Sequence, residues 1–115
     1  MTRLYNVTRN QTLVDDLEIA ESVSARKRGL LGHPPLSLRE GMLIRPCRWI
    51  HMFGMKFAID VVYLDHRGKV VAFTESIAPR RIDRPVLNAH SAVEMAAGAI
   101  RHHGIRKGDV LEVRE

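Results

Sequence analysis

The sequence predicts a mainly β fold of the α+β class: a compact antiparallel sandwich or barrel-like sheet with two short helices. Three observations favour this fold. The apolar segments are short and rich in Val, Ile and Leu, turn residues such as Gly, Pro and Asp separate them at close intervals, and only two segments carry helix start and stop signals. A chain of 115 residues also suits one domain, so residues 1–115 are expected to share one core.

The N-terminal part of the chain is expected to contain short strands and one helix. Ser24 can cap the start of this helix, and Gly32 followed by Pro34 and Pro35 ends it, because glycine adopts the left-handed conformation and proline cannot continue a helix. The predicted elements are strands over Arg3–Thr8, Thr12–Val14 and Leu17–Ala20, a turn over Arg9–Gln11 and a helix over Ala25–Leu31.

The rest of the chain alternates apolar runs with turns. Asp65 to Gly68 (DHRG) is a turn with glycine where a positive φ is expected, so the runs on either side form a hairpin. Gly104 closes the second helix. The predicted elements are strands over Gly41–Ile44, Ile59–Leu64, Lys69–Thr74, Ala92–Ala96 and Val110–Val113, a loop over Ala78–Pro85, a helix over Ala99–His103 and a turn over Arg106–Asp109.

Composition restricts the partners and the compartment. Lys and Arg total 18 against 13 acidic residues, giving a formal net charge of +5, which favours anionic partners. The single Cys47 excludes an internal disulfide. Neither a secretory signal peptide nor an apolar run of about 18 residues is visible. We therefore expect a cytoplasmic protein with no membrane partner.

Separated motifs follow one another along the chain in a recognisable order. They are Arg28–Gly32 (RGLLG), Gly41–Leu43 (GML), His51–Val61 (HMFGMKFAIDV), Leu64–Asp65 with Gly68, Ala97–Gly98, His103–Ile105 (HGI) and Gly108–Asp109. In this order they resemble the domain-of-unknown-function 192 family over nearly the whole chain, from about Leu17 onwards. The resemblance implies a compact single-domain fold rich in β-structure and assigns no biochemical role.

The densest group of chemically versatile side chains lies between Cys47 and Asp60 (CRWIHMFGMKFAID). Apolar side chains with a few polar ones are the usual composition of a ligand pocket, so the leading hypothesis is a non-catalytic binding module for a small ligand or peptide. Asp60 has an alternative role, because a carboxylate in an apolar strand must find a partner such as a backbone amide or Arg28. The expected ligand-binding residues are Met42, Trp49, His51, Met55 and Asp60.

The alternative function is that of a nucleic-acid-associated protein. Two basic clusters would neutralise phosphates, and they must meet on one face of the fold to do so. The clusters are Arg26, Lys27 and Arg28, and Arg80, Arg81 and Arg84.

A small enzyme is the third class of function that the sequence leaves open. It would use His51 with Asp60, or Cys47 as a nucleophile activated by His51. Thiolate, imidazole and thioether groups also bind Cu(I), and Cys47, His51, Met52 and Met55 supply them. Methionines at such spacing are more often core residues, so we expect no metal and no cofactor.

Overall fold

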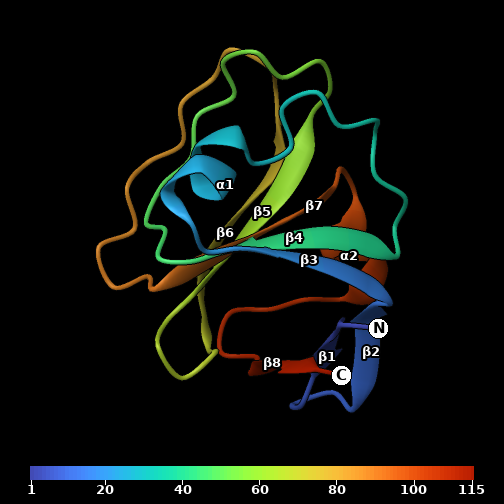
Figure 1. Ribbon diagram of the computed structural model, residues 1–115. Coiled ribbons are helices and arrows are strands. Elements are labelled where there is room, and N and C mark those ends of the chain that lie inside the picture. Colours follow the sequence, from blue (N-terminus) through green and yellow to red (C-terminus); the bar gives the residue numbers. More distant parts are fainter.

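Eight strands form two sheets, and two short helices accompany them (Figure 1). The computed structural model describes residues 1–115. The three-stranded sheet has the order β2-β1-β8, with β1 (Arg3–Asn6), β2 (Gln11–Val14) and β8 (Leu111–Arg114). The five-stranded sheet has the order β3-β4-β7-β5-β6, with β3 (Asp16–Ala20), β4 (Glu40–Ile44), β5 (Ile59–Leu64), β6 (Val70–Ile77) and β7 (Ser91–Ala96). The helices are α1 (Val23–Arg28) and α2 (Ala99–His103). The predicted mainly β class with two short helices is therefore confirmed.

All strand pairs are antiparallel except β3 and β4, which run parallel from Asp16 opposite Glu40 to Ala20 opposite Ile44. A parallel pair needs a long crossover connection, and here that connection contains α1. Neither sheet closes on itself. Neither helix has the length and apolar character needed to cross a membrane.

Each face of the five-stranded sheet covers its own apolar core. The first core, between the two sheets, contains 14 buried residues, including Leu4 and Leu13 from the small sheet and Val62 and Val93 from the large one. The second core lies on the opposite face and contains 12 buried residues, with Leu30 from the segment after α1 packing among them. Strands β5 and β7 are buried along their whole length, which is why their sequences do not alternate between apolar and polar residues.

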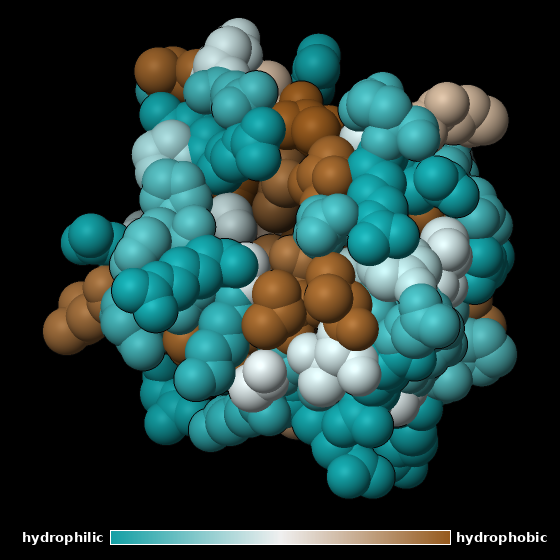
Figure 2. Space-filling view, turned by 90° about the horizontal axis from the view of Figure 1, so that it is seen from below, coloured by the Kyte–Doolittle hydropathy of each residue, from teal (hydrophilic) through white to brown (hydrophobic).

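The surface seen from below Figure 1 is not uniformly polar. Apolar side chains gather near the middle of this face, and hydrophilic side chains frame them (Figure 2). Apolar atoms make up more than half of a typical protein surface, so this distribution by itself needs no special explanation.

Helix α1 begins and ends earlier than its sequence signals predicted. Ser22, not Ser24, is the N-cap, and its hydroxyl accepts a hydrogen bond from the Ala25 amide at 3.1 Å. The helix stops at Gly29, with φ of 47°, one turn before the predicted Gly32. Two glycines with positive φ follow the helical segment, and the first of them ends it.

Several strands also differ from prediction at their ends. Strand β6 continues past Thr74 to Ile77, because β5 remains paired with it as far as Ile59 opposite Ile77. Strand β1 ends at Asn6 rather than Thr8, and β8 covers Leu111–Arg114 rather than Val110–Val113. The hairpin, the second helix and its closing Gly104 are confirmed.

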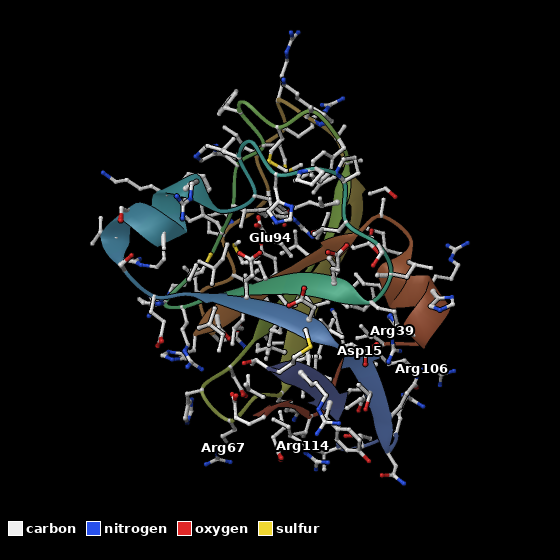
Figure 3. All side chains as sticks on the ribbon, turned by 45° about the vertical axis from the view of Figure 1, so that its right-hand side comes forward. Asp15, Arg39, Arg67, Glu94, Arg106 and Arg114 are labelled. Carbon is white, nitrogen blue, oxygen red and sulfur yellow. The ribbon has the colours of Figure 1, made fainter.

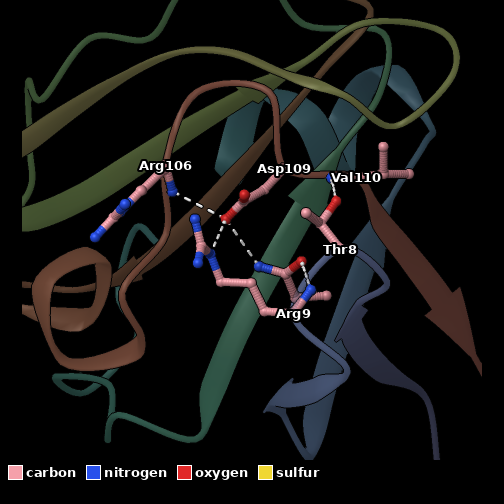
Figure 4. Close-up of polar contacts among 6 residues, drawn as sticks. Thr8, Arg9, Arg106, Asp109 and Val110 are labelled. Atoms are coloured by element: carbon pink, nitrogen blue, oxygen red, sulfur yellow. Dashed lines mark hydrogen bonds and ion pairs between the residues drawn. The ribbon is translucent and has the colours of Figure 1, made fainter.

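A buried carboxylate fastens the two ends of the chain together (Figure 4). Asp109 Oδ2 accepts hydrogen bonds from Asn6 Nδ2, Arg9 Nε and the Arg106 amide, each at 3.0 Å. Burial acts to raise the pKa of Asp109, but the hydrogen bonds from Asn6 and Arg9 outweigh it and lower the pKa. The turn between β1 and β2 is thereby held against the turn before β8.

Gly68 provides a test of the hairpin and of its contact with β8. Its φ is 83°, and a Cβ placed there would overlap the Leu111 carbonyl oxygen. We expect Gly68→Ala to lower the free energy of unfolding by about 3 kcal/mol, since the substitution adds a backbone overlap to the cost of a positive φ.

Gly108→Ala is the matched control for this prediction. Gly108 has a similar φ of 91°, but a Cβ placed there would meet no other atom within 4 Å. Its substitution should cost only about 1 kcal/mol, the conformational part of the effect. Equal losses of stability in urea denaturation would show that Gly68 does not pack against β8.

Candidate ligand-binding pocket

A cavity of about 640 Å³ opens beside α1, on the face of the large sheet that carries the second core. Its walls come from α1 with the residues after it, from the irregular segment between β4 and β5, and from two sheet positions, Ile44 and Glu94. The charged, aromatic and sulfur-containing side chains that line it are Arg26, Lys27, Arg28, Cys47, Arg48, Trp49, His51, Phe53, Met55 and Glu94.

Glu94 supplies a buried carboxyl group to this pocket. It lies in the middle of β7, between Met42 of β4 and Val61 of β5, and only 6 % of its surface is exposed. Its Oε1 atom is buried and has no hydrogen-bond partner. Burial raises the pKa of Glu94 to about 7, because a carboxylate loses its hydration there. Figure 3 shows Glu94 above β4, on the side of the sheet where α1 lies.

The end of α1 packs close to this carboxyl group. A Cβ built on Gly29 would lie 3.4 Å from Glu94 Oε1, so the glycine backbone is nearly in contact with it. No donor from this backbone reaches the carboxyl, since the Gly29 amide donates to the Ala25 carbonyl oxygen at 2.9 Å. The Oε1 atom therefore stays unpaired although it is enclosed.

Four cationic side chains line the same pocket. Lys27, Arg28 and Arg48 are exposed, whereas Arg26 is half-buried. None of the four takes part in an ion pair. Arg26 donates from Nη1 to the Pro46 carbonyl oxygen at 3.3 Å, and its buried Nε has no partner. The pocket thus combines a positive mouth with unsatisfied hydrogen-bonding groups inside.

Three aromatic rings form a row along one wall. The ring centroids of Trp49 and His51 are 6.0 Å apart, and those of His51 and Phe53 are 5.5 Å apart. The row exists because this segment is extended, so that alternate residues point the same way. Ile50 and Met52 point into the second core, and Trp49 and Phe53 remain 47 % and 51 % exposed.

A neighbouring loop holds the aromatic row in place. The Met52 amide donates to the Arg81 carbonyl oxygen at 2.8 Å, and the Asp83 amide donates to the Ile50 carbonyl oxygen at 3.0 Å. Asp83 is itself fixed to the sheet, because its carboxylate accepts a hydrogen bond from the Tyr63 hydroxyl at 2.7 Å and another from Thr74. The row is therefore tied to β5 and β6 through this loop.

Of the five expected ligand-binding residues, Trp49, His51 and Met55 line the pocket, whereas Met42 and Asp60 do not. Met42 is buried in the second core. Asp60 is fully buried elsewhere, where it accepts hydrogen bonds from the Ser76, Gly98 and Ile100 amides at 2.8, 3.1 and 2.9 Å. Its partners are backbone amides, which is the alternative role described above.

Of the residues considered for an enzyme, Cys47 and His51 both line the pocket, whereas Asp60 does not. Asp60 therefore does not join His51 there. The Cys47 thiol donates to the Trp49 carbonyl oxygen at 3.2 Å, and burial raises the pKa of this thiol. Met52, a potential soft-metal ligand, is fully buried in the second core.

The two basic clusters lie in segments on the same side of the large sheet. Arg26, Lys27 and Arg28 line the pocket, whereas Arg80, Arg81 and Arg84 do not. The loop with the second cluster pairs with the aromatic row through His51 and Ile82. In Figure 1 the loops before β5 and before β7 both lie on the α1 side of the sheet.

Sequence reasoning missed Glu94. The signal was present, since Glu94 is the one charged residue in the run SAVEMAAGAI, as Asp60 is in IDVVYL. A charged residue in an apolar strand needs a partner, and this expectation identified Asp60. The segment around Glu94 combines strand and helix signals, so the direction of the Glu94 side chain could not be predicted from the sequence.

Comparisons with solved structures show the fold. A protein from Sinorhizobium meliloti 1021, described as a candidate transcription regulator, aligns with a TM-score of 0.79 and 24 % identity, over 97 % of this chain and 91 % of its own. A protein of unknown function from Novosphingobium aromaticivorans DSM 12444 aligns with a TM-score of 0.82 and 17 % identity, over 96 % of this chain and 82 % of its own.

The comparison with curated proteins found no match. The family model DUF192, described as an uncharacterized ACR, matches residues 5–113. Because this match covers nearly the whole chain, with both helices, all pocket residues and at least part of every strand, the protein belongs to the DUF192 family.

Proposed function

We propose that this protein is a non-catalytic binding module whose pocket takes a small organic anion with a flat apolar body. One observation carries the proposal: unpaired cationic side chains and an exposed aromatic row line the same cavity. We also propose that it acts in the cytoplasm, where its single Cys47 stays reduced.

The charges around the pocket support an anionic ligand. Lys27, Arg28 and Arg48 are exposed and have no acidic partner, so their field at the mouth is not cancelled locally. Guanidinium groups bind carboxylate, sulfonate and phosphate groups through paired N–H donors. A ligand with such a group gains both attraction and directed hydrogen bonds.

The aromatic row supports a flat apolar body. Trp49 and Phe53 are half exposed. A ligand that covers these rings removes their apolar surface from water, which favours binding. Indole and phenyl faces stack on planar ligands, and the row is fixed by its backbone pairing with the loop that contains Asp83.

Binding is favoured over nucleophilic catalysis by the state of the reactive groups. The Cys47 thiol is held by the Trp49 carbonyl oxygen and has a raised pKa, so little thiolate forms near neutral pH. The acid expected beside His51, Asp60, is engaged by three backbone amides.

A fluorescent probe tests the proposed chemistry. Anilinonaphthalene sulfonate has an aromatic body and one anionic group, and N-phenyl-naphthylamine is its neutral counterpart. We expect saturable binding of the sulfonate, and about tenfold weaker binding of the neutral probe, since one charge-assisted contact is worth about 1.4 kcal/mol.

Two arginine variants control for nonspecific adsorption of the probe. Arg48→Ala removes a cation from the mouth and should weaken sulfonate binding about fivefold. Arg67→Ala removes an exposed cation from the distant β5–β6 turn and should leave binding unchanged. Equal affinity in both variants, or equal affinity for both probes, contradicts an anion-binding pocket.

Burial of the Glu94 carboxyl group predicts a pH-dependent stability. Its pKa is raised from 4.5 to about 7 in the folded protein, so the folded state retains a proton that the unfolded state releases as the pH rises. Stability should therefore fall between pH 4.5 and pH 7, by up to about 3 kcal/mol relative to Glu94→Gln, and level off above.

Urea denaturation of both proteins across this pH range measures the effect. The difference between wild type and Glu94→Gln isolates the contribution of this group, and Glu112→Gln, at an exposed strand position, controls for the loss of a charge. A pH-independent difference would mean that Glu94 remains hydrated.

A second candidate function is binding of single-stranded nucleic acid. The observation that favours it is the backbone pairing of the loop bearing Arg80, Arg81 and Arg84 with the segment of the aromatic row. Aromatic side chains beside cationic ones bind single strands through base stacking and phosphate contacts.

The salt dependence of binding tests this second function. If the clusters act together, binding of a short oligothymidylate should weaken steeply as salt rises. The triple variant Arg80→Ala, Arg81→Ala, Arg84→Ala should reduce the slope of log affinity against log salt by roughly 2 to 3. No binding at low salt would remove this candidate and leave the small-anion pocket in place.

A further inference from the structure

We infer that the anion is a nucleotide whose base enters the pocket and donates two hydrogen bonds to Glu94, which selects guanine over adenine. This inference rests on the proposed anion-binding function and names its substrate class. The geometry behind it is an unpartnered, almost fully buried carboxyl group in a cavity with aromatic and cationic walls.

The carboxyl group lacks donors because of its place in the sheet. Strand β7 is paired on both sides, with β4 and with β5, so its neighbours' backbone amides are engaged in the ladder. The apolar neighbours Met42 and Val61 offer no side-chain donor, and the Gly29 amide is engaged within α1. An enclosed acceptor without a partner is costly, so a ligand that brings N–H donors gains the full value of the missing bonds.

Guanine matches a carboxylate along one edge. Its ring N–H and its exocyclic amino group lie side by side and point the same way, and a carboxylate presents two acceptor oxygens at a similar spacing. Adenine offers an amino group beside an unprotonated ring nitrogen, whose lone pair faces a carboxylate oxygen. The same site therefore disfavours adenine, because its ring nitrogen and the carboxylate oxygen are both acceptors and cannot form a hydrogen bond with each other.

The order of groups along the pocket matches the order within a nucleotide. Among these groups exposure rises in the same order: Glu94 is 6 % exposed, Trp49 and Phe53 are about half exposed, and Lys27, Arg28 and Arg48 are at the surface. A base whose edge meets Glu94 can stack on the aromatic row, and its phosphate then lies among the cations. The cavity of about 640 Å³ is within the usual range of about 300–1,000 Å³ for ligand pockets.

Calorimetric titrations with three mononucleotides test the inference. We expect guanosine monophosphate to bind tightest, inosine monophosphate, which lacks the amino group, to bind about tenfold more weakly, and adenosine monophosphate to bind weakest. Guanosine without phosphate should also lose about tenfold, since it makes no contact with the cations.

Variants assign these preferences to particular groups. Glu94→Gln should reduce the preference for guanosine over adenosine monophosphate to about twofold or less, while Glu112→Gln retains it. If circular dichroism shows that Glu94→Gln is unfolded, Arg48→Ala serves instead. It should abolish most of the advantage of guanosine monophosphate over guanosine and keep the preference for guanine.

Free nucleotides and nucleic-acid chains are two sources of the same chemistry. One probe is an oligothymidylate with one central guanine. If it binds at least tenfold tighter than both guanosine monophosphate and plain oligothymidylate, the ligand is a nucleic-acid strand. Otherwise the mononucleotide is the ligand. Either outcome retains the base selection by Glu94.

The outcomes separate failure of this inference from failure of the proposed function. Equal binding of guanosine and adenosine monophosphates, or no binding of either with sulfonate binding intact, overturns the guanine assignment alone. Loss of both nucleotide and sulfonate binding overturns the anion-binding pocket as well.

Discussion

Burial of β7 on both faces is the constraint on which the rest of the structure depends. The strand lies between β4 and β5, and its six residues are all buried. One face meets the first core and the small sheet, and the other meets the second core and α1. Since every side chain of β7 is enclosed by one layer or the other, each polar residue on it or beside it must find a hydrogen-bond partner there or remain unpaired.

Asp60 and Glu94 show the two outcomes of this constraint. Asp60 opposes Met95 and Glu94 opposes Val61 across the same pair of strands, so their side chains lie on opposite faces of the sheet. On the first face, the start of α2 and the distorted end of β6 present three amides to Asp60. On the second face, the backbone of Gly29 after α1 approaches Glu94, but its amide donates to the Ala25 carbonyl oxygen instead. The first carboxylate joins three backbone segments, and the second leaves a buried oxygen without a partner in the cavity.

The pocket forms where irregular segments cover the second core incompletely. Residues such as Ile50 and Met52 anchor their segment in the core, and the residues between them project outward. The Asp83 carboxylate, held by Tyr63 and Thr74, fixes the loop against which this segment is aligned. A fixed aromatic row and a set of cationic side chains can thus lie beside a buried acid, without any long helix.

The sequence by itself determined the fold class, the β5–β6 hairpin, the second helix and most strand positions, because short apolar runs, turn glycines and caps act over a few neighbouring residues. It also grouped Trp49, His51 and Met55, which line one cavity in the structure. Only the tertiary structure decided that Asp60 is structural, that Ser22 caps α1, and that Glu94 lies unpaired beside four cations. The physical reason is that hydrogen-bond satisfaction depends on which distant backbone amides reach a side chain, and strand order and facing set this, not local pattern.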